Sequence, residues 1–373
     1  MNSLLRPSWV FTLTVILALS AGNAIAQQYI FTNDNVANSN NSTTAMSVNG
    51  KGAVKLLKTY PTGGKSAGGG YFAVSTITSS KTRLGNCLFV SNGGDSSISA
   101  FQMDLFNGSL NAIHGSPFSD GVGGAQHFGI GLSAGNRFLF AGNTNNNSIS
   151  VMKISSNCSL KLSKMFTVPG SPAGMKVTPD GSFLIVAYIG NVDSFKIDPD
   201  TGDLTELGPF SPKGSAAGVD ISCDGTTAYF GDAAANTQVE AFSINSSGEL
   251  KEINNFTNKN GESSNNIMLS VDGKHLYVSN TMSNQITILS VGSNGALTYE
   301  NTVKLNKPGT YSLGLATGTS GADLFVSEQN TTESIGVLAT NGDTVKEVPG
   351  SPFHVVKNGS APAGLTSVPR SCN

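Results

Sequence analysis

Acidic residues stand at two places where the surrounding sequence pattern otherwise carries asparagine. Asp232 and Glu328 each end a short run of β-forming residues, and the related runs end in Asn or Tyr. A carboxylate there has the chemistry of a general base that activates water, so Asp232 is the candidate catalytic residue. The polar residues at the equivalent positions form a candidate ring that binds a sugar, a polyol or a cation through oxygen atoms. They are Asn33, Asn92, Asn143, Tyr188, Asn280 and Glu328. The alternative is that Asn at this position only satisfies the turn that leaves the strand.

Three other residues with ionisable side chains occupy positions that the repeat pattern defines. His127 follows a glycine-rich segment at the start of a strand, where an imidazole is either a base or ligand contact, or a rim residue bonded to a neighbouring loop. Lys176 and Asp220 share one offset from an Asp-Gly turn in successive repeats. We expect them to face each other as an ion pair that holds two neighbouring strands in register.

No metal or cofactor site is predicted. The cysteines form no CxxC motif, and the histidines do not converge in the repeat pattern. The acidic segment 198–203 is shorter than a calcium-binding loop and is predicted to be a hairpin turn.

The elements that hold these residues come from an internal repeat. A frame of two or three β-formers, a small residue and a polar residue occurs seven times, ending at residues 33, 92, 143, 188, 232, 280 and 328. The intervals of 44 to 59 residues match a four-stranded propeller blade. An alternating strand precedes most frames, often through an Asp-Gly turn, and two further strands follow each frame. The sequence therefore predicts an all-β, seven-bladed β-propeller.

The first repeat lacks its inner strand, whereas a strand-like piece, residues 364–368, is left over at the end of the chain. Placing that piece beside Tyr29 completes the first blade and removes an open sheet edge. We expect a single domain over 27–373, with the first blade closed by this C-terminal inner strand. In that geometry Cys87 and Cys372 lie on one face and are the predicted disulfide, whereas Cys158 and Cys223 are expected to be too far apart to pair.

Residues 1–26 have the features of a secretory signal. Arg6 precedes an apolar stretch that is too short to span a bilayer, and Ala24 to Ala26 form a small-x-small cleavage site. The alternative is an uncleaved membrane anchor. We expect a secreted protein, periplasmic or extracellular, with no membrane span after cleavage.

The charge of the chain excludes nucleic acids as partners. The chain has 22 basic and 24 acidic residues, only 12% charged in total, with no basic cluster that would follow a nucleic-acid backbone. The expected partner is a small molecule, a glycan or a protein at the channel mouth, and the expected oligomeric state is a monomer.

The frame, the Asp-Gly turn ahead of it and the Gly-Ser-Pro-Phe elements at 115–118 and 350–353 resemble the lactonase-type seven-bladed propellers, which include 6-phosphogluconolactonase-like and YVTN repeat proteins. The resemblance implies a catalytic set of His, Glu and two Arg from blades four to six. Those positions fall in this chain near Ala173 and Gly174, at Ala217, at Asp232 and near Thr281, so that only an acidic group is kept. We therefore expect a secreted binding or interaction module. The alternative is an exported lactone hydrolase with a site rebuilt around Asp232, and a purely structural surface protein also fits the sequence.

Overall fold

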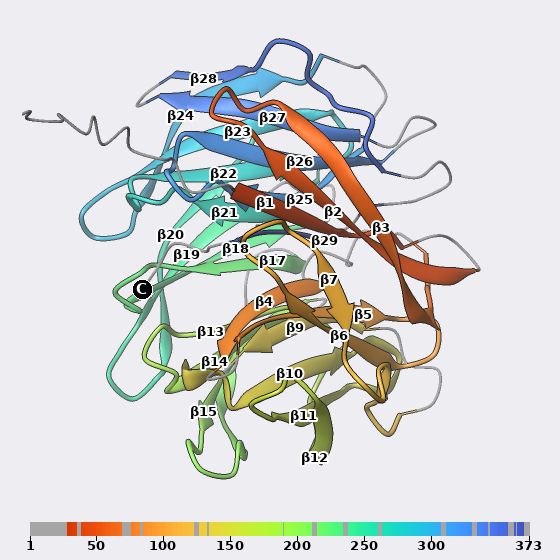
Figure 1. Ribbon diagram of the computed structural model, residues 1–373. Coiled ribbons are helices and arrows are strands. Elements are labelled where there is room, and N and C mark those ends of the chain that lie inside the picture. Colours follow the sequence, from red (N-terminus) through yellow and green to blue (C-terminus); the bar gives the residue numbers. More distant parts are fainter. Residues whose placement is uncertain are drawn as a thin grey trace, which may run out of the picture.

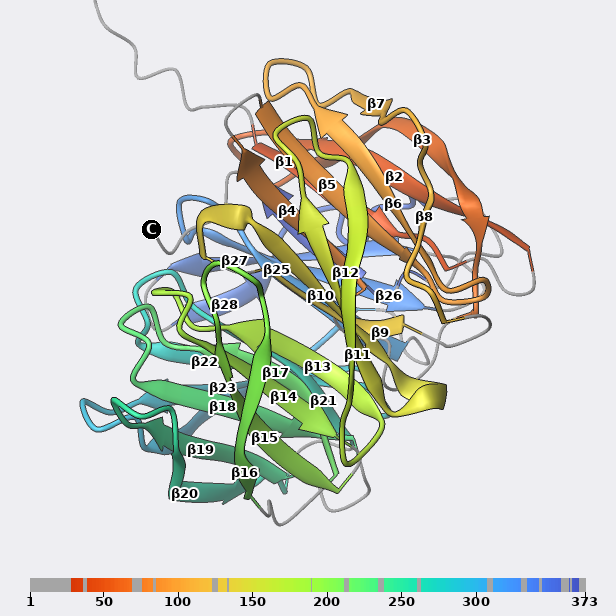
Figure 2. The ribbon, with the colours of Figure 1, turned by 90° about the horizontal axis from the view of Figure 1, so that it is seen from below.

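The chain forms seven antiparallel sheets, one for each predicted blade (Figure 1). The computed structural model describes residues 28–35, 39–68, 76–82, 85–122, 127–132, 134–188, 190–210, 215–233, 238–259, 263–306, 311–329, 334–341, 344–356, 362 and 364–368. Figure 2, seen from below, shows the sheets of the first two blades lying next to each other. The prediction of an all-β, seven-bladed propeller is confirmed.

Each blade runs from an inner strand at the central channel to an outer strand at the rim, and its strands are named in that order. Blade 1 consists of β29 (Gly364–Val368), β1 (Gln28–Asn33), β2 (Asn40–Val48) and β3 (Val54–Lys65). Blade 2 consists of β4 (Ile77–Thr82), β5 (Gly85–Asn92), β6 (Ser97–Met103) and β7 (Leu110–Ala112), with β8 (Phe118–Ser119) also paired to β6. Blade 3 consists of β9 (His127–Leu132), β10 (Phe138–Asn143), β11 (Ser148–Ile154) and β12 (Leu160–Thr167).

The remaining four blades follow in chain order. Blade 4 consists of β13 (Pro172–Val177), β14 (Phe183–Tyr188), β15 (Asn191–Ile197) and β16 (Leu204–Phe210). Blade 5 consists of β17 (Ala216–Ile221), β18 (Thr227–Asp232), β19 (Gln238–Ile244) and β20 (Leu250–Thr257). Blade 6 consists of β21 (Ser264–Leu269), β22 (His275–Asn280), β23 (Gln285–Val291) and β24 (Leu297–Lys304). Blade 7 consists of β25 (Tyr311–Thr317), β26 (Asp323–Gln329), β27 (Ser334–Asn341) and β28 (Thr344–Glu347).

The ring is closed by the two ends of the described chain. Strand β29 pairs antiparallel with β1, from Tyr29 opposite Val368 to Asn33 opposite Gly364. Strand β29 also contacts the inner strands of both neighbouring blades, β25 and β4. The borrowed inner strand predicted from the leftover repeat is therefore present.

The core lies between the blades, with one apolar cluster at each of the seven blade interfaces. Successive side chains of a second strand point to opposite faces of its sheet. In β10, Phe138 and Phe140 pack towards blade 4, whereas Leu139 and Ala141 pack towards blade 2. Both faces of each second strand are thus buried. This explains why each frame is a continuous run of β-forming residues and does not alternate with polar ones.

The inner and second strands of blades 4 to 6 are joined by the predicted Asp-Gly turns. The glycines adopt a left-handed backbone, with φ of 78° at Gly181, 73° at Gly225 and 70° at Gly273. The preceding Asp accepts hydrogen bonds within the turn, as Asp180 does from the Ser182 amide and hydroxyl. Burial would raise the pKa of Asp180, but the hydrogen bonds from the Thr178 hydroxyl and from Ser182 outweigh it and lower the pKa.

The predicted disulfide between Cys87 and Cys372 is wrong, because Cys87 is bonded to Cys158, with Cα atoms 5.7 Å apart. The reason is strand parity. Cys87 and Phe89 face blade 3, whereas Leu88 faces blade 1 and the closing strand. Cys158 lies in the blade 3 turn that meets this face. Cys223 is also disulfide-bonded, and Cys372 lies outside the described residues.

Helical structure in the described ranges consists of two 3₁₀ turns, η1 (Ala134–Asn136) and η2 (Thr144–Asn146). Over those same ranges, no helix has the length and apolar character needed to cross a membrane.

Candidate functional site

The central channel has two mouths that differ in construction. The frame-end mouth is defined by the last residues of the second strands, such as Asp232, and by the first residues of the inner strands. The Asp-Gly mouth is defined by the turns at Asp180, Asp224 and Asp272. Most of the sequence-predicted site residues belong to the frame-end mouth, whereas Lys176 and Asp220 lie near the Asp-Gly mouth.

The four asparagines of the predicted ring are fully buried, each 0% exposed. Asn33 donates to the carbonyl oxygens of Thr76 and Ser91, which belong to blade 2. Asn92, Asn143 and Asn280 each donate to a hydroxyl on the neighbouring third strand of the same blade. The amides therefore hold neighbouring strands and blades together.

The other members of the ring are also enclosed. Tyr188 is 1% exposed, and burial together with the nearby charges of Asp193 and Glu206 raises the pKa of its hydroxyl. Glu328 is 0% exposed and lies over Gly336, where any Cβ would come within 2.3 Å of its Oε1 atom. Gly336 thus makes the space that a buried glutamate requires.

The catalytic candidate Asp232 is 3% exposed at the end of β18. Its Oδ1 accepts a hydrogen bond of 2.8 Å from the Ser215 amide, which fixes the segment before β17. His127 is the first residue of β9 and pairs with Asn143, but its side chain lies outside what the structure describes.

The positions that the lactonase resemblance assigns to basic residues are filled by closely packed backbone. A Cβ added to Gly174 would lie 2.2 Å from the Ala217 carbonyl oxygen. In the next blade, a Cβ on Gly218 would lie 2.6 Å from the Asn265 carbonyl oxygen. Ala217 is 0% and Thr281 is 2% exposed. At Gly174, therefore, any larger side chain requires the backbone to move, and the Ala217 and Thr281 positions are buried.

The Asp-Gly mouth, in contrast, contains a cavity of about 160 Å³. Four inner strands contribute to its wall, from Lys176 on β13 and Asp220 on β17 to Leu269 on β21 and Thr317 on β25. Lys176 donates to the Oδ1 atom of Asp220, so the predicted pairing of these two residues across blades 4 and 5 is present.

A second cavity of about 200 Å³ lies beside the first, between blades 6 and 7. Its wall includes His275 and Tyr277, and the Nε2 atom of His275 lies 3.3 Å from the Glu300 carboxylate. Burial raises the pKa of Tyr277 to about 12. The two cavities share Ser270 and Val271, which belong to the turn region after β21.

Sequence reasoning missed a buried carboxyl in blade 4. Asp193 is 0% exposed. The equivalent third-strand position carries Ser99, Ser150 or Thr287 in blades 2, 3 and 6, and a second buried acidic residue, Glu240, in blade 5. Burial is the main cause that raises the pKa of Asp193 to about 7, and the neighbouring Glu206 carboxyl adds to it. Alignment of the repeats at this position would have revealed both acidic residues.

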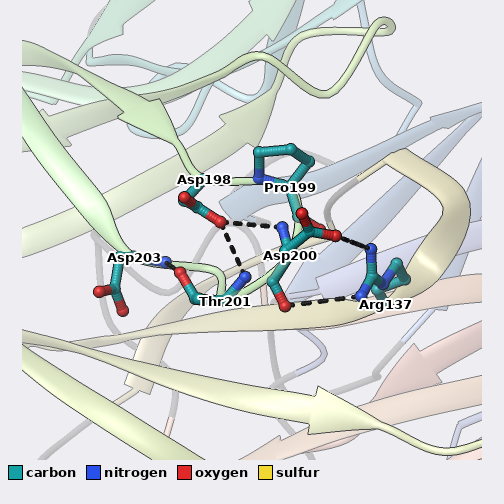
Figure 3. A network of polar contacts seen from close by, with 6 residues as sticks. All are labelled: Arg137, Asp198, Pro199, Asp200, Thr201 and Asp203. Atoms are coloured by element: carbon teal, nitrogen blue, oxygen red, sulfur yellow. Dashed lines mark hydrogen bonds and ion pairs between the residues drawn. The ribbon is translucent and has the colours of Figure 1, made fainter.

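The acidic segment 198–203 forms the hairpin turn between β15 and β16, as predicted (Figure 3). The Asp198 carboxylate accepts hydrogen bonds from the amides of Asp200 and Thr201, each 2.9 Å. Arg137 of blade 3 donates to the Pro199 carbonyl at 2.8 Å and to the Asp200 carboxylate at 3.1 Å. The turn thus links two blades. Nowhere in the described ranges do three or more His, Cys, Asp or Glu side chains gather so as to hold a metal ion.

Comparison with known proteins agrees with this architecture. No curated protein matches the chain. A 6-phosphogluconolactonase candidate from Bacteroides fragilis superposes with a TM-score of 0.75 at 20% identity, over 93% of this chain and 99% of its own. A periplasmic gluconolactonase from Pseudomonas aeruginosa gives a TM-score of 0.70 at 18% identity, over 90% of this chain and 97% of its own.

A family model described as lactonase, 7-bladed beta-propeller, matches residues 85–220 and 222–349. The chain therefore belongs to the seven-bladed lactonase propeller family.

Proposed function

We propose that the protein is an exported member of this family that lacks the usual lactonase catalytic set and works as a binding module. The observation that carries the proposal is the close approach of the Gly174 position to the Ala217 carbonyl, with 2.2 Å left for any Cβ. A lactone hydrolase needs a cationic or hydrogen-bonding group for the oxyanion, and the loss of one such donor typically costs about 10²–10³ in rate.

The environment of Asp232 supports the same proposal. A general base must reach a water molecule beside the substrate, whereas this side chain is 3% exposed. Its Oδ1 atom is engaged by the Ser215 amide of the same blade. These contacts suit a residue that holds the start of the inner strand.

Export is supported by two observations. The Cys87–Cys158 disulfide suits an oxidising compartment, and one structural neighbour is described as periplasmic. We propose that cleavage after Ala26 releases a protein that begins at Gln27. The intact mass of protein recovered from an exporting host tests this, because retention of residues 1–26 contradicts it.

The decisive experiment measures proton release from a panel of sugar and aliphatic lactones. We expect no turnover above buffer for the wild type, with circular dichroism showing that the protein is folded. Asp232→Asn is the diagnostic variant, and Asp224→Asn at an exposed turn is its matched control. Turnover that disappears in Asp232→Asn but persists in Asp224→Asn would overturn the proposal and establish a lactone hydrolase rebuilt around Asp232.

A further inference from the structure

The Asp-Gly mouth of the channel, which the family resemblance does not use, contains a cavity among the described residues. At the frame-end mouth, backbone atoms of adjacent inner strands leave no room for a Cβ at Gly174 or Gly218. At the Asp-Gly mouth the same strands enclose the cavity of about 160 Å³. For comparison, an apolar cavity of about 150 Å³ takes up a benzene molecule. The space therefore suits a small ligand of about six to nine non-hydrogen atoms.

The wall of this cavity is mainly apolar. Its aliphatic members come from three blades and are Val177, Pro179, Ile221, Met268, Leu269 and Val271. Of the two lining hydroxyl residues, Ser270 already donates to Asp272 at 2.6 Å. A sugar or polyol would lose hydration of its hydroxyls in this cavity without gaining matching partners, which is costly. The wall thus favours a ligand with an apolar body.

Both members of the charged pair line the cavity, but they differ in exposure. The Asp220 carboxylate is held from behind by two backbone amides, those of Ile221 at 2.9 Å and Leu269 at 2.8 Å. Its side chain is 4% exposed, whereas that of Lys176 is 25% exposed. The carboxylate is fixed between blades 5 and 6, and Lys176 is the more accessible member of the pair.

We propose that the Asp-Gly mouth binds a small organic acid, whose carboxylate contacts Lys176 and whose apolar body fills the cavity between blades 4 and 6. The inference rests on the proposed binding function and gives it a site and a ligand class. Pairing between an ammonium and a carboxylate in a partly enclosed site is stronger than a neutral hydrogen bond. The aliphatic wall supplies the rest of the affinity and excludes polyols.

The test uses benzoate as the probe, measured by calorimetry and by ligand-observed NMR on the purified protein. Benzyl alcohol is the neutral analogue and gluconate is the hydroxylated acid. We expect saturable benzoate binding by the wild type, with affinity at least roughly tenfold higher than for either analogue. Benzyl alcohol lacks the carboxylate that Lys176 would bind, and gluconate lacks an apolar body for the aliphatic wall.

Two variants and one control assign the site. Lys176→Met should weaken benzoate binding at least roughly tenfold, because the carboxylate loses its ammonium partner. Lys164→Met removes an exposed lysine that pairs with Asp203 on the outer strands, and it should bind like the wild type. Val271→Phe fills the cavity but keeps the ion pair, so it should abolish binding even if Lys176→Met does not fold.

Absence of saturable binding by the wild type would overturn the inference, as would unchanged binding by folded Lys176→Met or by Val271→Phe. The lactone assay remains a separate test. Without benzoate binding and without lactone turnover, only this inference fails. Lactone turnover that depends on Asp232 refutes the proposed function, whether or not benzoate binds.

Discussion

Asp193 gives the sharpest test of how burial shapes this protein, because its carboxyl group is fully enclosed and its pKa is raised to about 7. The unfolded chain has an ordinary Asp pKa near 3.8, so the folded state binds a proton more tightly. Stability is therefore unpenalised below about pH 4 and falls as pH rises through the interval up to about pH 7. A shift of about three pKa units corresponds to about 4 kcal/mol at pH 8.

Asp193→Asn removes this penalty and keeps the local hydrogen bonding. The amide oxygen still accepts from the Ser194 backbone amide, which now lies 2.7 Å from Oδ1, and the amide nitrogen can donate to Glu206. We expect the variant to unfold with the same free energy as the wild type at pH 4 and to be more stable by up to about 4 kcal/mol at pH 8.

The measurement is urea denaturation of both proteins at pH 4, 5.5, 7 and 8. Asp224→Asn is the control of opposite sign, because turn hydrogen bonds lower the pKa of Asp224, so its contribution is present at neutral pH and is lost as pH falls. A difference between wild type and Asp193→Asn that stays constant across the four pH values would refute the buried-charge reasoning.

Two further predictions concern packing and the disulfide. Gly174→Ala should lower the free energy of unfolding by about 2–3 kcal/mol, because its Cβ would overlap the Ala217 carbonyl. Gly292→Ala, at an exposed position, is the control. Equal shifts of the thermal unfolding midpoint for the two variants would contradict the packing argument. The double variant Cys87→Ser/Cys158→Ser should lose about 4 kcal/mol in urea, since the bridge closes a loop over a sequence separation of 71 residues, and an unchanged transition would show that the bridge does not stabilise the fold.

The fold was predictable because its signals are local and repeated. Each frame supplies a strand with two buried faces, and each Asp-Gly pair supplies a turn with a left-handed glycine. The closing strand was predictable from the number of strands in each repeat, because the first repeat lacks an inner strand and one strand is left over at the end of the chain. The Lys176–Asp220 pair followed from equal offsets in successive repeats.

The environments of the site residues were less predictable, because they depend on side-chain contacts within and between blades that the repeat pattern does not specify. The frame-end asparagines occupy the predicted positions, but loops of adjacent blades and third-strand hydroxyls take up their amides. The disulfide partner of Cys87 depended on which face of β5 it occupies, a parity that the neighbouring Leu88 and Phe89 encode. The cavity at the Asp-Gly mouth is formed where four inner strands come together, which no single repeat encodes.

The pairing of β1 with β29 also sets a timetable for folding. Strand β1 is the first strand of the chain to reach the compartment where the protein folds, and its partner follows about 330 residues later. During that time the inner edge of β1 has no partner, so the ring exists only as an open arc that other strands are able to join. A circularly permuted chain that starts at β29 and continues into β1 would supply the missing neighbour at once and shorten the vulnerable period.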